Sequence, residues 1–218
     1  MDIKFWKERW EKGQTGFHQS EINLHLQTFW SSMGLKPGQR VFVPLCGKSL
    51  DLLWFLEKGF AVTGIEISEI AVNSFFEENN LQALEHNSEG MNYFNCKELS
   101  LICGDYYSLS SDMMEPIHAV YDRASLIAMP PEMRVSYAKH MGELVLPGTP
   151  ILLVSIEYNQ SEMSGPPFAV HSKEVDSLYE NDFDVEIIDT KDILNEYPQF
   201  RDRGLSGLKE VIYKLVRK

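Results

Sequence analysis

The stretch "RVFVPLCGKSLDLLWFLEKG" (residues 40–59) joins a short apolar run to a helical pattern through a tight turn. The run at 40–45 has the β-branched and aromatic content of a buried strand. After the turn, apolar residues at 50, 53, 54 and 56 share one face of a helix. A strand that passes directly into a helix is the building unit of a parallel α/β sheet. This stretch therefore predicts the fold class and places a turn at the carboxyl end of its first strand.

The same alternation continues along the chain. Further strands are predicted at 61–67, 99–107, 118–125 and 149–158, and helices at 68–79 and 131–145. Ser68 is suited to cap the first of these helices, and Pro131 is suited to open the second. Because the strands are almost continuously apolar, they indicate a parallel sheet covered on both faces.

Both ends of the chain depart from this rhythm. Two helices precede the first strand, at 3–13 with Trp6 and Trp10 on one face, and at 23–34 with Gly34 as its stop. A helix at 173–181 precedes two strands, 183–194 and 209–218, joined by the polar stretch 195–207. We expect an α/β fold with a seven-stranded, mostly parallel sheet and an antiparallel last strand. It forms a single domain, residues 1–218, in which residues 1–34 are a helical lid.

Composition bounds the function classes. The chain has 218 residues, of which 44% are hydrophobic, and a net charge of −12, which argues against a nucleic-acid partner. The cysteines Cys46, Cys96 and Cys103 match neither a zinc nor a redox spacing, and free thiols fit a reducing compartment. The first ten residues do not resemble a signal peptide, and no run of 18 apolar residues occurs. We expect a cytoplasmic monomer that binds no membrane and no metal.

The turn at 44–49 lacks the glycines of a phosphate-binding loop. A Walker A loop needs glycine five residues before Gly47, and Phe42 stands there. The dinucleotide fingerprint fails as well, since Leu45, Ser49 and Leu50 occupy positions where further glycines are needed. The turn is therefore not predicted to cradle phosphates, and Lys48 is most simply a surface lysine.

Glu66 ends the second predicted strand, 19 residues after Gly47. An acid about 20 residues past such a turn accepts hydrogen bonds from ribose hydroxyls. A ribose-binding acid without a phosphate cradle fits a nucleoside cofactor that carries no phosphates, of which S-adenosylmethionine is the common one. The alternative is that Glu66 is only an acid near the N-terminus of the following helix, where the helix dipole stabilises a negative charge.

Two further strand ends carry residues capable of chemistry. Asp105 and Tyr106 follow the third strand, where an adenine edge and face would be met. Asp122 and Arg123 end the fourth strand, and they can form a structural ion pair as readily as a ligand contact.

These stretches resemble the thiopurine S-methyltransferase family, in its shorter bacterial type, within the class I S-adenosylmethionine-dependent methyltransferases. The matching segments span nearly the whole chain in the family's order: "WEKGQTGFHQ" (10–19), residues 40–68, "CGDYY" (103–107), "YDRASLIAMPPEMR" (121–134) and "SGPPFAV" (164–170). The resemblance implies a Rossmann-like three-layer sandwich. The class usually has a more glycine-rich first turn than Pro44-Leu45-Cys46.

The resemblance also implies roles for individual residues. Those implied to contact S-adenosylmethionine are Trp10, Leu45, Glu66 and Arg123, with the Asp105–Tyr106 turn near the adenine. Those implied to line the acceptor pocket are Phe17, Pro167 and Phe168. Arg123 is the residue expected to serve catalysis.

The implied reaction is S-methylation of an aromatic or heterocyclic thiol, such as a thiopurine, with S-adenosylhomocysteine as the second product. Proximity and exclusion of water can supply most of the acceleration, and an acidic thiol needs little general base. His18 can be a base or a structural hydrogen-bond donor, and Trp6 and Trp10 can be core or a cofactor wall. The alternatives are methylation of selenium, tellurium or another small chalcogen acceptor, and a non-catalytic module that binds S-adenosylmethionine.

Overall fold

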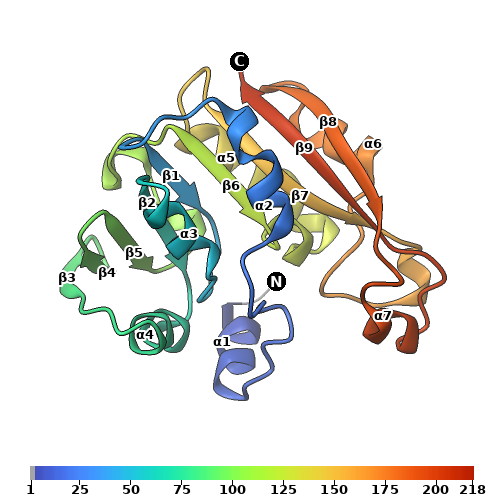
Figure 1. The fold of residues 1–218 in the computed structure, drawn as a ribbon, viewed down its shortest axis with the longest axis horizontal. Coiled ribbons are helices and arrows are strands. Elements are labelled where there is room, and N and C mark those ends of the chain that lie inside the picture. Colours follow the sequence, from blue (N-terminus) through green and yellow to red (C-terminus); the bar gives the residue numbers. More distant parts are fainter. Residues whose placement is uncertain (1–2) are drawn as a thin grey trace. The chain divides into compact units, whose positions relative to one another are not determined.

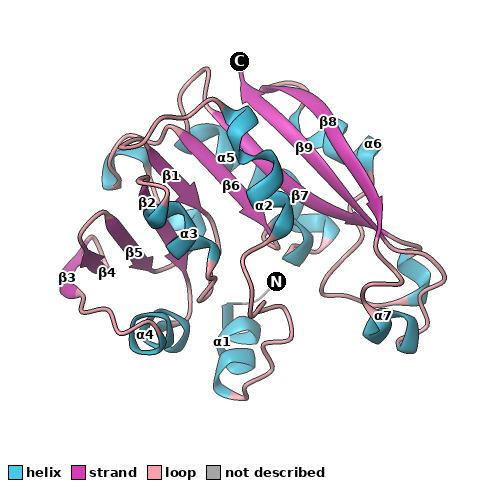
Figure 2. Cartoon of the chain, viewed as in Figure 1, coloured by secondary structure: helices cyan, strands magenta, loops and turns pink. Residues whose placement is uncertain are grey.

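The computed structural model describes residues 3–218; the part of the predicted lid at residues 1 and 2 lies outside the described residues. The chain forms two compact units, residues 1–121 and 122–218. Figure 1 traces the elements along the chain, and Figure 2 colours them by type.

The first unit alternates helices and strands after two N-terminal helices. Its helices are α1 (Ile3–Glu11), α2 (Leu24–Phe29), α3 (Asp51–Glu57) and α4 (Glu69–Glu78), with short 3-10 turns η1 (Trp30–Met33), η2 (Tyr106–Ser108) and η3 (Ser111–Met113). Its strands are β1 (Arg40–Val43), β2 (Ala61–Glu66), β3 (Leu84–Ser88), β4 (Met91–Cys96) and β5 (Leu99–Cys103), and β6 (Ala119–Arg123) runs across the boundary to the second unit.

Local sequence signals explain where these elements begin and end. The Asn23 side chain caps α2 by accepting from the amides of His25 and Leu26, and Gly34, at φ 75°, closes the 3-10 turn that extends it. The Ser68 side chain accepts from the Ala71 amide, so the predicted cap of α4 is confirmed. Asn23 and Ser68 thus accept hydrogen bonds from amides that the start of a helix leaves unpaired, and Gly34 adopts the left-handed conformation that ends one.

The sheet of the first unit has a parallel centre. Strands lie in the order β3-β4-β5-β2-β1-β6, and β1 pairs in parallel with both β2 and β6. The chain moves from β1 outward to β2 and β5 and then returns to the other side of β1, so the strand order reverses beside β1. Ligands of open α/β sheets bind at such a reversal, beyond the carboxyl ends of the strands. The turn that follows β1 lies at this point.

The antiparallel hairpin β3–β4 was not predicted. It adds two strands to the seven that the sequence predicts, and β4 pairs antiparallel with β5. Every residue of β3 is exposed, so the strand carries no apolar pattern to reveal it. It is recognisable only by its turn, in which Glu89 and Gly90 both have positive φ.

The second unit packs helices against antiparallel strands. After the end of β6 it contains η4 (Leu126–Ala128), α5 (Pro131–Leu144), β7 (Pro150–Glu157), η5 (Gln160–Glu162), α6 (Ser172–Tyr179), β8 (Phe183–Asp192), α7 (Pro198–Asp202) and β9 (Lys209–Arg217). β9 pairs antiparallel with both β7 and β8, as expected for the closing strands. The stretch predicted as a polar connection contains the short helix α7.

None of the helices formed by residues 3–218 has the length and apolar character that crossing a membrane requires.

Candidate functional site

The turn after β1 is held in a compact conformation by backbone contacts. Leu45 and Gly47 both have positive φ, 46° and 53°. The Cys46 amide donates to the Ile65 carbonyl at 2.9 Å, which ties the turn to β2. A leucine in the left-handed region is uncommon and unfavourable, so the surrounding structure must hold it there.

The Glu66 carboxylate supplies part of that hold. Its Oε2 accepts from the Gly47 amide at 2.9 Å, and its Oε1 accepts from the Ser68 amide at 2.8 Å. The side chain is buried, and burial raises the pKa of Glu66, opposed by hydrogen bonds from the amides of Ser68, Gly47 and Ile67. Glu66 therefore joins the turn after β1 to the start of α4.

This arrangement fits a ribose. An ionised carboxylate has about four lone-pair sites on its two oxygens, and the amides of Gly47, Ser68 and Ile67 use at most three of them. The carboxylate therefore retains capacity for a hydroxyl donor. The alternative in which Glu66 serves only the helix dipole does not account for its bond to Gly47, 19 residues away.

The N-terminal helix brings an aromatic surface to the same turn. A Cβ built on Gly47 would lie 3.2 Å from the Trp10 ring, so the indole packs directly on the glycine. Phe17 contacts the edges of both Trp10 and Trp6, at ring-centroid distances of 5.5 and 5.6 Å. Trp10 is buried and Phe17 is half-buried. The structure thus brings Trp10, Leu45 and Glu66, three of the residues predicted to contact the cofactor, together around one turn.

The turn after β5 lies next to Glu66 through backbone pairing. The Gly104 amide donates to the Glu66 carbonyl at 2.9 Å. The Asp105 side chain accepts from the Tyr107 amide at 3.1 Å and caps η2. The Tyr106 ring is buried, whereas Tyr107 is half-buried. The carboxylate of Asp105 therefore remains the more accessible of the two predicted adenine contacts.

Two cysteines flank the Glu66 position, which the sequence analysis did not anticipate. Cys46 lies in the turn, and Cys103 pairs with Glu66 across the β2–β5 ladder. Burial, and then the Glu66 charge, raise the pKa of the Cys46 thiol and raise that of Cys103 to about 11. Both thiols are free. Their positions after β1 and at the end of β5, the strands on either side of β2, follow from two predicted strand ends, but their protonation depends on burial.

Asp51 is a second buried acid that the sequence analysis passed over. Its Oδ1 accepts from the Asn23 amide at 2.8 Å, and its Oδ2 accepts from the Tyr121 hydroxyl at 3.1 Å. Asp51, the first residue of α3, thereby holds Asn23, the residue that caps α2. The signal available in the sequence was an acid inside the apolar pattern "LDLLWF". By contrast, Lys48, which was predicted to be a surface lysine, is half-buried and pairs with Glu78 of α4.

Arg123 lies in the second unit, at the end of β6. Its side chain is half-buried, and within residues 3–218 its guanidinium makes no hydrogen bond or ion pair. Asp122 does not pair with it; the Asp122 carboxylate accepts instead from the Tyr137 hydroxyl at 2.8 Å and the Leu126 amide at 3.2 Å. The alternative of a structural Asp122–Arg123 ion pair is therefore wrong, and the guanidinium is available to a ligand.

The segment that carries Pro167 and Phe168 is also in the second unit. The Tyr158 hydroxyl donates to the Pro167 carbonyl at 2.7 Å, and the Phe168 amide donates to the Ile127 carbonyl at 2.7 Å. The guanidinium of the buried Arg134 lies 6.0 Å from the centroid of the Phe168 ring.

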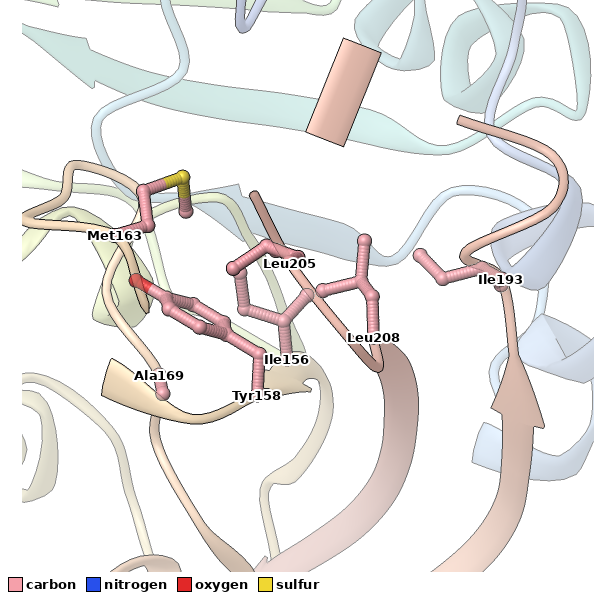
Figure 3. Close-up of a cluster of buried hydrophobic side chains, with 7 residues drawn as sticks. All are labelled: Ile156, Tyr158, Met163, Ala169, Ile193, Leu205 and Leu208. Atoms are coloured by element: carbon pink, nitrogen blue, oxygen red, sulfur yellow. The ribbon is translucent and has the colours of Figure 1, made fainter. Parts of the chain in front are cut away.

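A buried apolar cluster includes Ala169, the residue that follows Phe168 in the chain (Figure 3). Its members come from β7, the loop after it and the residues around the last two strands: Ile156, Tyr158, Met163, Ala169, Ile193, Leu205 and Leu208. Tyr158 belongs both to the cluster and to the hydrogen bond that holds Pro167. Tyr158 therefore links the Pro167 backbone to a packed apolar cluster.

A sequence profile of the thiopurine S-methyltransferase family (TPMT) matches residues 1–218. The thiopurine S-methyltransferase of Nitrosospira multiformis is 43% identical over 216 residues, covering 99% of this chain and 98% of that protein. That of Methylococcus capsulatus is 44% identical, covering 99% and 97%.

Solved structures share the fold. The Burkholderia thailandensis 1,6-didemethyltoxoflavin-N1-methyltransferase, with bound 1,6-didemethyltoxoflavin and S-adenosylhomocysteine, superimposes with a TM-score of 0.67 at 13% identity, covering 99% of this chain and 87% of that one. An S-adenosylmethionine-dependent methyltransferase from Anabaena variabilis gives a TM-score of 0.63 at 11% identity, covering 99% and 95%. The predicted class I methyltransferase fold is confirmed. The full-length profile match and the identity to curated relatives show that the chain belongs to the thiopurine S-methyltransferase family of S-adenosylmethionine-dependent methyltransferases.

Proposed function

We propose that this protein transfers the methyl group of S-adenosylmethionine to the sulfur of an aromatic or heterocyclic thiol of the thiopurine type. The observation that carries the proposal is the Glu66 carboxylate, buried at the strand-order reversal and bonded to the Gly47 amide beside a turn without phosphate-binding glycines. Such a turn suits a nucleoside cofactor. The name shared by the relatives with more than 40% identity supports a thiol acceptor.

In this proposal each predicted residue has a defined task. Glu66 accepts from the ribose hydroxyls, Leu45 and Trp10 form a wall of the cofactor site, and Asp105 with Tyr106 lies near the adenine. Arg123 offers its guanidinium, which has no hydrogen-bond or ion-pair partner among residues 3–218, to the cofactor carboxylate or to the acceptor. The residues proposed to line the acceptor pocket are Phe17, Pro167 and Phe168.

The cofactor supplies a methyl group on a positively charged sulfur, and the chain supplies position and a water-poor environment. Aromatic side chains such as Trp10 and Phe17 exclude water from the reacting atoms. The raised pKa values of Cys46 and Cys103 keep these two thiols protonated at neutral pH. Since the thiolate is the nucleophilic form, the protein's own sulfurs beside the cofactor site do not compete with the acceptor.

We further propose one methyltransferase domain over residues 1–218, with residues 1–34 as its lid, acting as a monomer in the cytoplasm. The three free cysteines support a reducing compartment. The net charge of −12 supports a soluble monomer without a nucleic-acid partner.

Two measurements test the function. Calorimetry with S-adenosylmethionine, S-adenosylhomocysteine, ATP and NADH is expected to show binding of the first two only. Turnover is then measured with an aromatic thiol, the matching phenol and aniline, and selenite. Methylation confined to the thiol supports the proposal, whereas methylation of selenite alone assigns a chalcogen acceptor, and binding without turnover assigns a non-catalytic module.

A further inference from the structure

The carboxylate of Asp122 organises the turn that carries Arg123. Asp122 is 1% exposed, and its partners come from the residues just after it and from α5. Its Oδ1 accepts from the Leu126 amide at 3.2 Å and its Oδ2 accepts from the Tyr137 hydroxyl at 2.8 Å; burial raises the pKa of Asp122, and hydrogen bonding from Tyr137, Leu126 and Ser125 opposes this rise. One carboxylate thus gathers donors from three residues.

The turn closed by these bonds has an unfavourable backbone. Ala124, between Arg123 and Ser125, has φ 65°, in the left-handed region that residues with a Cβ atom avoid. Such a residue stays in that conformation only where neighbouring contacts require it. The contacts that require it here are the Asp122 bonds to Ser125 and Leu126, which bridge the alanine.

Among residues 3–218, no hydrogen bond or ion pair fixes the direction of the Arg123 side chain. Within the described part of the chain its guanidinium has neither a hydrogen-bond partner nor an ion-pair partner, although its charge opposes the rise that burial, and then Glu210, cause in the pKa of Tyr197. The direction of the side chain therefore depends on the backbone from which it leaves β6. That backbone is set one residue earlier, by Asp122, and one residue later, by Ala124.

From this arrangement we propose that Asp122, held by the hydrogen bond from Tyr137, is a positioning residue that orients the side chain of Arg123. The proposal rests on the proposed function, because it requires that Arg123 serves the methyl transfer. A carboxylate suits the task better than a neutral amide, since only the carboxylate accepts at both oxygens. No cation pairs with Asp122 among the described residues, and an unpaired buried charge costs stability, which a purely structural link between β6 and α5 would not require.

A double-mutant cycle distinguishes a role of Asp122 in orienting Arg123 from a role only in the stability of the fold. Tyr137→Phe removes one donor to Asp122 and keeps the ring, and Arg123→Ala removes the side chain to be aimed. We expect Tyr137→Phe to lower kcat/KM for an aromatic thiol by about fivefold or more in the native background and to have less than about twofold effect in the Arg123→Ala background. The melting temperature is expected to fall by the same amount in both backgrounds. Equal kinetic losses in the two backgrounds would overturn the proposal.

Tyr179→Phe is the matched control. Tyr179 is also buried, and burial, followed by the charge of Asp122, raises its pKa well above the usual range, yet its hydroxyl makes no bond to Asp122. This variant is expected to keep native kcat/KM, and a loss equal to that of Tyr137→Phe would overturn the proposal. Should Tyr137→Phe fail to fold, Asp122→Asn replaces it in the cycle, with the same expected pattern.

A readout without substrates completes the test. Nuclear relaxation of the Arg123 Nε–H group in the cofactor-free protein is expected to show increased mobility in Tyr137→Phe and native mobility in Tyr179→Phe. Unchanged mobility in Tyr137→Phe contradicts the positioning role. If the proposed function is wrong but Asp122 does orient Arg123, a different result is expected. Arg123→Ala alone would then retain full kcat/KM, while Tyr137→Phe would still increase the mobility of the Arg123 Nε–H group.

Discussion

Glu66 serves the turn and, in the proposed function, the ribose with a single carboxylate. Its two oxygens already accept from the amides of Gly47 and Ser68, both in buried positions. A buried amide that loses its acceptor costs about 1–3 kcal/mol, more than the bond itself contributes. Truncation at Glu66 therefore affects folding as well as cofactor binding, and the two effects need separate variants.

Glu66→Gln is expected to bind S-adenosylhomocysteine about tenfold more weakly or worse, because it loses charge-assisted bonds to the hydroxyls. Glu66→Ala is expected to lose this affinity and also to unfold more easily, by roughly 1–3 kcal/mol for each orphaned amide. Calorimetry and urea unfolding measure the two effects. The exposed acid Glu69, in the first turn of α4, provides the control Glu69→Gln. Native affinity in both Glu66 variants would remove Glu66 from the ribose site.

Arg123→Lys is expected to retain the fold and to lower kcat/KM for an aromatic thiol by about tenfold or more, equivalent to about 1.4 kcal/mol of transition-state stabilisation. A planar guanidinium can bond a carboxylate through two donors, which an ammonium does poorly. Steady-state kinetics at limiting and saturating S-adenosylmethionine distinguish the possible partners. Restoration at saturation assigns Arg123 to the cofactor alone, and full activity at limiting concentrations of both substrates excludes it from the site.

At the scale of elements, the contact between α1 and the turn after β1 depends on Gly47. A methyl group there would approach the Trp10 ring to 3.2 Å, and the backbone φ of 53° disfavours any Cβ. Gly47→Ala is expected to destabilise the protein by about 1–2 kcal/mol from the left-handed backbone and, in addition, to weaken S-adenosylhomocysteine binding by displacing Trp10. Thermal unfolding and calorimetry measure the two losses.

Gly38→Ala is the matched control for Gly47→Ala. Gly38 has φ 87°, and a Cβ there meets no atom within 4 Å. This variant is expected to lose stability with native cofactor affinity. If Gly47→Ala behaves in the same way, the contact between Trp10 and the turn has no part in binding.

The N-terminal segment is expected to become more protected when the cofactor site fills. Hydrogen exchange in residues 1–18 should slow on addition of S-adenosylhomocysteine, because Trp10 and Phe17 gain the ligand as a partner in addition to the contact between Trp10 and Gly47. Exchange in the central turns of α5 provides the internal reference and should not change. Equal exchange of the segment with and without S-adenosylhomocysteine would mean that Trp10 is only part of the core.

Sequence reasoning found the elements whose signals are local. Pro131 opens α5, Ser68 caps α4, and the spacing from Gly47 to Glu66 placed the central acid. It missed β3, whose residues are all exposed and therefore show no apolar alternation. It also left the Asp122–Arg123 ion pair open, because the actual partner, Tyr137, lies 15 residues further along the chain. Contacts that depend on helix packing carry no spacing signal of this kind.

For the whole molecule, buried acids make stability depend on pH in an unusual direction. Burial raises the pKa of Asp122 from 3.8 to about 6, against the opposing hydrogen bonds of Tyr137, Leu126 and Ser125. It raises the pKa of Glu66 as well. Between pH 3.8 and about 6 the folded protein therefore binds more protons at Asp122 than the unfolded chain does. The contribution of such a group is fully present below pH 3.8 and is lost as the pH rises through the folded value.

Asp122→Asn, which cannot ionise, provides the measurement. A shift of about two pKa units corresponds to roughly 3 kcal/mol, so the unfolding free energy of the native protein should fall by about that amount relative to Asp122→Asn between pH 4 and pH 7.5. Urea unfolding of both proteins across this range gives the difference directly, and all other carboxylates cancel in it. The Tyr179 hydroxyl stays protonated throughout, because burial and then the Asp122 charge raise its pKa. If the two unfolding free energies differ by the same amount at every pH, Asp122 ionises with the same pKa in the folded and unfolded states. If the unfolding free energy of the native protein instead rises with pH relative to that of Asp122→Asn, the charge of Asp122 is stabilised by a cation.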